Sequence, residues 1–191
     1  MKRVATILVM LLVVSFLATG CRRSPAVPKP AETAANGIKV YTTFYPLYSF
    51  AARIAGDRAQ VESLVPAGVE PHDYEPSIKQ VTDIYDAQVF VFLGEAMEPW
   101  AKKLEGGLAE KEVLVVEVGQ DIIKDNDPHV WLDPILAKEL AYKIYKAMAE
   151  VDAKNSSYYE QNYLTLENQL DELHQGLKDA ASKGHRRDIV T

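Results

Sequence analysis

Residues 88–94 read QVFVFLG, a run of apolar side chains that ends at a glycine. A half-exposed strand would alternate apolar and polar residues, whereas an unbroken run is typical of a strand buried on both faces of a parallel sheet. Parallel strands need crossover connections, which are usually helices that cover the faces of the sheet. This short segment therefore predicts an α/β fold built on a parallel sheet.

The segments on either side of this run alternate between strand and helix patterns. Strands are expected at four places, which are residues 38–44, 59–65, 88–94 and 112–118. Helices are expected between them, at residues 46–56, 77–87 and 98–104. Short helical connections imply right-handed crossovers, with helices on both faces of the sheet. Apolar residues make up 48% of the chain, which is enough to fill such a core.

The pattern becomes helical after Asp133 and Pro134, which suit the N-cap and the first position of a helix. Apolar residues then recur at every fourth position: Leu136, Leu140, Ile144 and Met148. After a break near residues 152–157, a second stripe has spacings of four and three: Tyr159, Tyr163, Leu166, Leu170, Leu173 and Leu177. It predicts an amphipathic helix of about 25 residues, roughly 37 Å long, which suits a rigid connection between two lobes.

The N-terminus carries the features of an export signal. Lys2 and Arg3 precede an apolar run over residues 4–17 that is too short to span a bilayer comfortably and ends in small residues. The single cysteine, Cys21, directly follows LATG, so either ordinary cleavage or lipidation of Cys21 fits. Lipidation is favoured because LATGC resembles a lipobox, although Leu17 lies four residues before the cysteine instead of three. A lone exported cysteine also cannot form an internal disulfide.

The charge balance bears on the class of partner. The chain has 21 basic and 27 acidic residues, and residues 1–36 contain five of the basic residues and one of the acidic ones. The remainder therefore carries a net charge of −10. This excess of negative charge argues against nucleic acid as a partner and is compatible with a cationic ligand.

Two of the four histidines, His72 and His129, have matched surroundings. EPHDYEP at residues 70–76 and DPHVWLDP at residues 127–134 each place a proline before the histidine and an aromatic residue two positions after it. Both segments leave the carboxyl ends of expected strands, where open α/β sheets bind ligands. Neutral imidazole is the commonest metal-ligand side chain, so we expect the two histidines to converge on a metal ion.

Carboxylates stand beside both histidines, and they can be metal ligands, hydrogen-bond acceptors for the imidazoles, or helix caps. They are Asp73, Glu75, Asp127 and Asp133, and a cap is favoured for Asp133. The other two histidines are not expected to bind metal. His174 lies on the long amphipathic helix with a surface role, and His185 lies in the basic turn KGHRR.

The sequence lacks the common catalytic patterns. It contains no HExxH motif, phosphate-binding Walker loop, dinucleotide fingerprint or nucleophile elbow. Cys21 lies in a Pro- and Ala-rich stretch, so a Cys–His catalytic pair is implausible. The residues alone thus indicate an exported α/β domain with two metal ligands. They do not indicate a role in transport.

Three segments, in this order behind a lipobox, resemble the zinc and manganese solute-binding lipoproteins of ABC importers. They are residues 40–77, residues 94–100 (GEAMEPW) and residues 127–134. The resemblance implies two α/β lobes joined by one long helix, with the metal between them and His72 and His129 as the first two ligands. DIVT at residues 188–191 matches the strand before the third ligand, so the third and fourth ligands are expected beyond Thr191.

The resemblance favours zinc as the bound ion, with manganese as the alternative. EPHDYEPS and GEAMEPW look like the zinc branch of the family. Against this, many zinc members carry a histidine-rich loop before the second ligand, and GQDIIKDN at residues 119–126 has no histidine. The deciding third ligand, histidine in zinc importers and often glutamate in manganese importers, is not in the chain.

Composition and resemblance together divide the chain into five expected parts. These are a lipoprotein signal peptide (1–20), a Pro/Ala-rich tether (21–37), an N-terminal α/β metal-binding lobe (38–152), a long interlobe helix (153–184) and the first strand of a second lobe (185–191). The second α/β lobe is otherwise expected to be missing. Without it, the stripe on the long helix should be exposed or fold back on the first lobe.

The resemblance implies an extracytoplasmic component of an ABC importer that captures a divalent metal ion and delivers it to a permease driven by an ATPase. Such a protein is exported and is either lipid-anchored to the outer face of the cytoplasmic membrane or periplasmic. It is not an enzyme and has no catalytic cofactor. The alternatives are a surface adhesin of the same family and, as the weakest, a zinc-dependent hydrolase with Glu75 as its general base.

Overall fold

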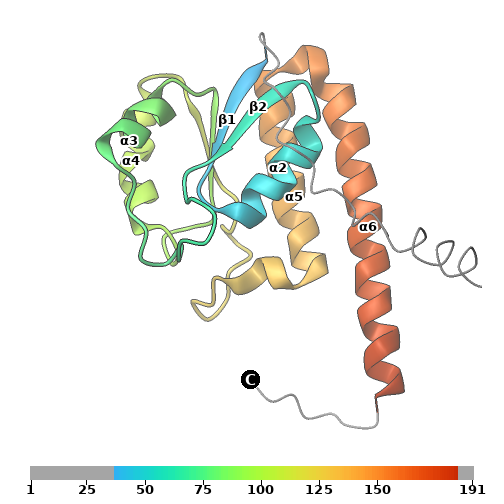
Figure 1. Cartoon of the computed structure of the whole chain (residues 1–191). Helices are drawn as coiled ribbons and strands as arrows, with labels where there is room; N and C mark the ends of the chain where they lie inside the picture. Colours follow the sequence, from blue (N-terminus) through green and yellow to red (C-terminus); the bar gives the residue numbers. More distant parts are fainter. Residues whose placement is uncertain (1–36, 185–191) are drawn as a thin grey trace, which may run out of the picture. The chain divides into compact units, whose positions relative to one another are not determined.

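The computed structural model describes residues 37–184, which contain a parallel four-stranded sheet (Figure 1). The strands are β1 (Ile38–Thr42), β2 (Ala59–Ser63), β3 (Val89–Phe92) and β4 (Leu114–Glu117). Their order in the sheet is β2-β1-β3-β4, and all three pairings are parallel. The α/β prediction that began with residues 88–94 is therefore confirmed.

Helices cover both faces of this sheet (Figure 1). The helices are α2 (Tyr45–Ala55), α3 (Ile78–Tyr85), α4 (Pro99–Ala109), α5 (Pro134–Val151) and α6 (Ser156–Lys183). Val89 and Val91 of β3 face the core shared with α2, α5 and α6, whereas Phe90 and Phe92 face the core shared with α3 and α4. All four β3 residues are buried, which explains why this strand has no polar position.

Helix α4 is longer than the sequence predicted. The expected segment ended at residue 104, but the helix continues through Gly106 and Gly107 to Ala109. Glycine weakens a helix in isolation, and that weakness hid the last turn from a propensity argument. Leu108 is fully buried in the core under α3 and α4, so tertiary packing stabilises the extra turn.

The two C-terminal helices begin and pack largely as predicted. Asp133 caps α5, because its Oδ1 accepts a hydrogen bond of 2.7 Å from the backbone N–H of Ile135. The long helix α6 has 28 residues, and its buried side chains are Tyr159, Tyr163 and Leu166. Leu173 and Leu177 each remain 51% exposed. The apolar stripe therefore packs on the lobe over its first half and is open over its second half.

Several expectations concern residues 1–36 and 185–191, which lie outside the described part of the chain. These are the signal peptide, lipidation of Cys21, almost all of the tether, the basic turn with His185 and the strand at residues 185–191. Among residues 37–184, no helix combines the length and the apolar composition needed to cross a membrane.

Candidate metal centre

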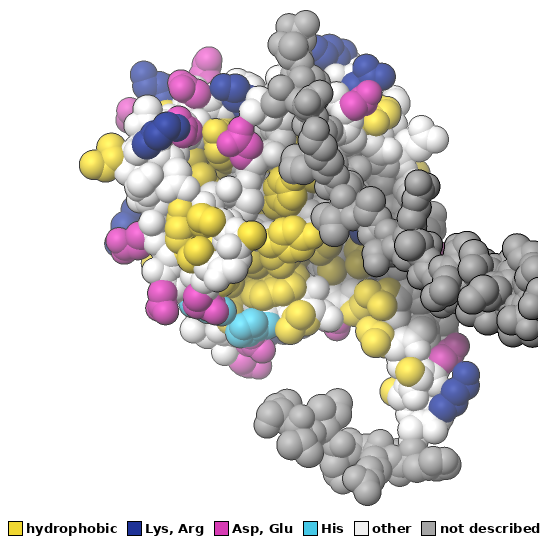
Figure 2. All heavy atoms as spheres, viewed as in Figure 1, with side chains coloured by type: hydrophobic (Ala, Val, Ile, Leu, Met, Phe, Trp, Pro, Cys, Tyr) yellow, Lys and Arg dark blue, Asp and Glu magenta, His cyan; other side chains and the backbone are white. Residues whose placement is uncertain are grey.

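His72 and His129 lie side by side at the carboxyl edge of the sheet. Each is carried by the segment that leaves an outer strand, β2 for His72 and β4 for His129. The centres of the two imidazole rings are 5.4 Å apart, and the ring planes are inclined by 45°. Figure 2 shows histidine side chains on the surface next to acidic side chains and a hydrophobic area. The expected convergence of the two loops is therefore present.

The separation of the two rings suits a shared tetrahedral ion. Zinc binds an imidazole nitrogen at about 2.0–2.1 Å, which places the ion about 3.2 Å from the centre of the ring. If both Nε2 atoms point at one ion, ring centres 5.4 Å apart correspond to a nitrogen–zinc–nitrogen angle of about 115°, close to the tetrahedral value. Both side chains are half exposed, so an ion can reach them from solvent.

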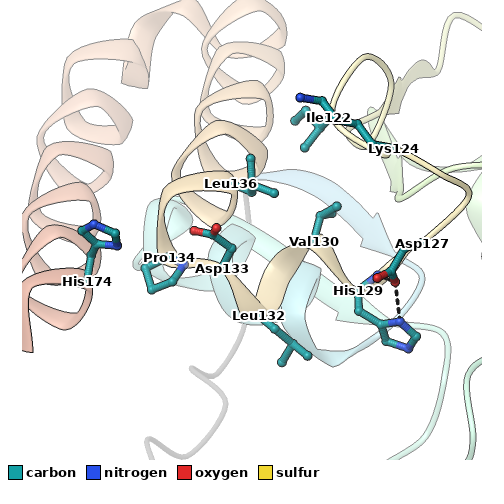
Figure 3. A pocket seen from close by; sticks show the side chains of 10 residues that line it. All are labelled: Ile122, Lys124, Asp127, His129, Val130, Leu132, Asp133, Pro134, Leu136 and His174. Carbon is teal, nitrogen blue, oxygen red and sulfur yellow. Dashed lines mark hydrogen bonds and ion pairs between the residues drawn. The ribbon is translucent and has the colours of Figure 1, made fainter. Parts of the chain in front are cut away.

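Each histidine is oriented by the carboxylate two positions before it. Glu70 Oε1 accepts hydrogen bonds from the backbone N–H of His72 at 3.2 Å and from its Nδ1 at 2.5 Å. Asp127 Oδ1 accepts the equivalent bonds from His129 at 3.0 Å and 2.7 Å (Figure 3). An ionised carboxylate can only accept, so Nδ1 carries the proton, and in the neutral imidazole the lone pair is on Nε2.

Electrostatics keep both carboxylates ionised. Hydrogen bonds from the His72 side chain and backbone lower the pKa of Glu70. Those from the His129 backbone and side chain lower the pKa of Asp127. A hydrogen bond donated to a carboxylate stabilises its charged form, so neither acid becomes protonated at neutral pH. The two imidazoles therefore retain one tautomer, with Nε2 as the available donor.

Glu70 is the functional residue that the sequence argument missed. Asp73 and Glu75 are the acids expected beside His72, but both are exposed and neither is hydrogen-bonded to the imidazole. Asp127 was named, and the structure gives it the role of acceptor for His129. The available signal was the shared order of acid, proline and histidine, EPH in one loop and DPH in the other.

The His72 loop is attached to the lobe by side-chain hydrogen bonds. Tyr74 Oη donates to the carbonyl of Leu64 at 2.9 Å, and Gln80 Nε2 donates to the same carbonyl at 2.9 Å and to Tyr74 Oη at 2.6 Å. Gln80 Oε1 also accepts from the backbone N–H of Ser77, completing a capping box at the start of α3. This Tyr74–Gln80 cluster ties the loop to the end of β2.

The His129 loop is supported by aromatic contacts and a short helix. His129 begins η1 (His129–Leu132), and the Trp131 ring lies 5.3 Å from the His129 ring and 4.9 Å from the buried Phe44 ring. Just before it, Asp125 and Asn126 have φ of 54° and 60°, and the N–H of Asp127 donates to the carbonyl of Lys124. Asp and Asn tolerate this left-handed conformation. The turn leads into Asp127, whose carboxylate is hydrogen-bonded to His129.

An open cavity of about 650 Å³ adjoins His129. Its wall is formed by the loop after β4, the first turn of α5 and His174 of α6 (Figure 3). His174 was assigned a plain surface role, and it is half-buried where it lines this cavity. Figure 3 shows it on the opposite wall from the His129 ring, near Asp133 and Pro134.

The described residues bring two imidazoles together, and no third possible metal ligand joins them. Across residues 37–184, no group of three or more His, Cys, Asp or Glu side chains is arranged to hold a metal ion. The site is therefore a pair of imidazoles, whereas a structural zinc site normally has four ligands.

Both histidines lie within a segment that matches a known protein family. Residues 40–191 match the family described as zinc-uptake complex component A, periplasmic. The chain belongs to this zinc-uptake family. The resemblance that began with the two histidine segments is confirmed, including its zinc branch.

Two relatives show how far this chain extends along such proteins. The high-affinity zinc uptake system protein ZnuA of Bacillus subtilis is 31% identical over 181 residues, which cover 84% of this chain and 57% of that protein. The Zn(II)-bound ZnuA-like domain of Streptococcus pneumoniae AdcA is 35% identical with a TM-score of 0.75, over 80% of this chain and 58% of that domain. The chain thus spans a little over half the length of these relatives.

A third relative carries two activities in its description. The laminin binding protein Lmb of Streptococcus agalactiae is described as bifunctional, with adhesin and metal transporting activity. It is 31% identical with a TM-score of 0.71, over 77% of this chain and 57% of that protein. The zinc-uptake family consists of metal-binding transport proteins and not of enzymes, in agreement with the sequence prediction.

Proposed function

We propose that this chain is the metal-capturing lobe of an extracytoplasmic zinc-binding protein that serves an ABC importer. The observation that carries the proposal is the pairing of His72 and His129, whose rings lie 5.4 Å apart while a carboxylate occupies each Nδ1. Membership of the zinc-uptake family supports it. In this account the lobe binds zinc on its open edge, and a permease with its ATPase then takes the ion across the membrane.

The chemistry of the two donors favours zinc over manganese. Imidazole nitrogen suits zinc, whereas manganese prefers carboxylate, carbonyl and water oxygens. Glu70 and Asp127, the nearest acids, are already engaged with the imidazoles. The remaining ligands come from a second lobe, which also covers the cavity beside His129 and the exposed residues Leu173 and Leu177.

The test is a zinc competition titration on the complete protein. His72→Ala and His129→Ala should each weaken zinc binding well over tenfold, because each removes one of about four ligands. His174→Ala is the matched control, since His174 lines the cavity that adjoins His129 but lies away from the histidine pair. The zinc affinity of this variant should equal that of the wild type. Unchanged affinity in both ligand variants would contradict the site. Selectivity is measured by repeating the titration with Mn²⁺, which should bind more weakly than Zn²⁺.

Membrane attachment is a separate part of the proposal. We place the protein at the outer face of the cytoplasmic membrane, held by lipid on Cys21, because two acyl chains on one residue give stable anchoring. Cys21→Ser should move the protein from the membrane fraction to the soluble fraction without altering zinc affinity. Retention of the variant in the membrane fraction would contradict lipid anchoring.

Surface adhesion is a second candidate role, favoured by the description of Lmb as an adhesin with metal transporting activity. The two roles are separated by removing the metal. If this protein is an adhesin as well, its binding to laminin-coated surfaces should survive His72→Ala and complete removal of zinc. Loss of binding without zinc would make adhesion a consequence of metal capture.

A further inference from the structure

The centre of the carboxyl edge is occupied by a side chain of the protein itself. In the strand order β2-β1-β3-β4, the chain passes from β1 to its neighbour β2 on one side and from β3 to its neighbour β4 on the other. The point at which the strand order reverses, the topological switch point, therefore lies between β1 and β3. In open parallel sheets this crevice is the usual ligand site. Here it contains the carboxylate of Glu98, which is only 3% exposed.

The carboxylate of Glu98 is bound as an anionic ligand would be. Its Oε1 accepts a hydrogen bond from the hydroxyl of Thr43, the first residue after β1. Its Oε2 accepts the backbone N–H groups of Leu93 and Gly94, directly after β3, at 3.1 Å each. Successive backbone N–H groups at the end of a strand form a concave anion site. Glu98 therefore fills the switch point and joins the ends of the two central strands.

On each of the two strand ends joined by Glu98, a backbone carbonyl anchors one histidine loop. The carbonyl of Thr43 accepts the N–H of Val65 at 2.9 Å, where the chain leaves β2 toward His72. The carbonyl of Leu93 accepts the N–H of Gly119 at 2.7 Å, where the chain leaves β4 toward His129. One buried carboxylate thus lies beneath both loops and contacts neither histidine.

A second route links this carboxylate to His129. Phe44 directly follows Thr43, and its buried ring packs edge-on against Trp131 at 4.9 Å. Trp131 in turn lies 5.3 Å from the His129 ring. A change in the position of Thr43 would therefore be passed on to the ring that holds one of the two metal donors.

We propose that Glu98 is a positioning residue of the metal centre, an internal carboxylate that occupies the switch-point crevice and sets the relative position of the two histidine loops. The inference rests on the proposed zinc-binding function. Glu98 itself does not bind the metal. Its removal should separate or loosen the two imidazoles while leaving all metal ligands in the chain.

The first test uses chemical rescue in the complete protein. Glu98→Ala empties a site whose donors remain, so zinc affinity should fall about tenfold or more and recover when formate or acetate is added. Sodium chloride at the same concentration controls for ionic strength and should not restore it. Asp152→Ala is the matched variant, because Asp152 is the other buried acid among the described residues and lies at the far end of α5. It should lower stability and leave zinc affinity unchanged.

The second test uses substitutions that leave no large cavity in the core. It can be carried out even if the Glu98→Ala variant does not fold. Thr43→Val removes the hydroxyl that donates to Glu98, while Thr42→Val removes a neighbouring buried hydroxyl that donates instead to the Glu62 carbonyl. Thr43→Val should weaken zinc binding at least threefold, Thr43→Ser should restore it, and Thr42→Val should match the wild type. Equal affinities for Thr43→Val and Thr42→Val would overturn the proposal, as would a Glu98→Ala loss that no carboxylate restores.

His72→Ala separates failure of this inference from failure of the proposed function. If His72→Ala loses zinc affinity while Thr43→Val keeps it, the metal site holds and the positioning role of Glu98 is wrong. If His72→Ala itself binds zinc normally, the site assignment is wrong and the positioning role fails with it.

Discussion

The two histidine loops are alike around the imidazole and different where they join the lobe. In both, a carboxylate two residues before the histidine accepts its backbone N–H and its Nδ1. The His72 loop is then fixed by the polar Tyr74–Gln80 cluster, whereas the His129 loop rests on the Phe44–Trp131 ring contact. A short local motif thus orients each imidazole, and different contacts with the surrounding fold hold that motif in place.

The difference follows from what comes next in the chain. His129 begins η1 and is separated by four residues from Pro134, the first residue of α5, so regular structure restrains it directly. The segment after His72 has no helix until Ile78, and side-chain hydrogen bonds must supply the restraint. We therefore expect the shared motif to matter most for zinc binding, the ring contact less, and the polar cluster least.

The largest effect is expected for the shared motif. Glu70→Ala and Asp127→Ala should each weaken zinc binding about 10- to 100-fold, because the imidazole loses the partner that fixes its tautomer and orientation. Both acids are exposed, so the thermal stability of the metal-free protein should barely change. Glu75→Ala, in the same loop but without a bond to His72, is the control in a competition titration. A Glu75 effect as large as that of Glu70 would show that the acid–proline–histidine motif is not the orienting unit.

A smaller effect is expected for the ring contact under His129. Trp131→Ala should lower zinc affinity about tenfold, equivalent to about 1.4 kcal/mol, because His129 loses the surface against which it packs. Trp100→Ala is the matched control, since Trp100 packs against Phe90 on the other face of the sheet. Calorimetry should show destabilisation in both variants and a loss of affinity in Trp131→Ala alone. Equal zinc affinities would remove the ring contact from the account.

A still smaller effect is expected for the polar cluster under His72. Tyr74→Phe removes one hydroxyl from the cluster and should cost about 1 kcal/mol of stability, with zinc affinity falling about threefold. Tyr163→Phe loses a similar hydroxyl contact, to Glu167 on α6, and should leave affinity unchanged. If Tyr74→Phe weakens binding more than Trp131→Ala does, the assumed order of the two supports is reversed.

The smallest effect on affinity is expected for the carboxyl of Glu98 when only its charge is changed. Burial, with a small addition from the like charge of Glu117, raises the pKa of Glu98 to about 7, while hydrogen bonds from Thr43, Gly94 and Leu93 act in the opposite direction. The folded protein therefore holds this proton more tightly than the unfolded chain. That contribution to stability is complete below the unfolded-state pKa and is lost as the pH rises through about 7.

The pH dependence is measured against Glu98→Gln, which cannot titrate. Between pH 5 and pH 8 the unfolding free energy of the wild type should fall by roughly 2–3 kcal/mol relative to the variant. Denaturant unfolding of the metal-free protein at several pH values gives this difference. Parallel pH profiles for the two proteins would contradict a raised pKa for Glu98.

The sequence predicted the sheet, the histidine pair and the cap at Asp133 because each has a local signal. The apolar run at residues 88–94 can be recognised from consecutive residues alone, and so can a histidine that follows a proline after a strand. Glu98 had no such signal, since an acid within GEAMEPW reads as exposed and its burial depends on the meeting of β1 and β3. Glu70 did have a signal in the shared acid–proline–histidine order, but only the folded turn shows that its carboxylate returns to His72.

The central claim is that Nε2 of His72 and Nε2 of His129 bind the same zinc ion. It is tested most directly by recording long-range proton–nitrogen spectra of the histidine side chains while zinc is added to the complete protein. We predict that both Nε2 resonances shift together at one equivalent of zinc, with both Nδ1 atoms still protonated. Zinc binding that leaves either imidazole unshifted, or that deprotonates Nδ1 of either ring, would contradict the account.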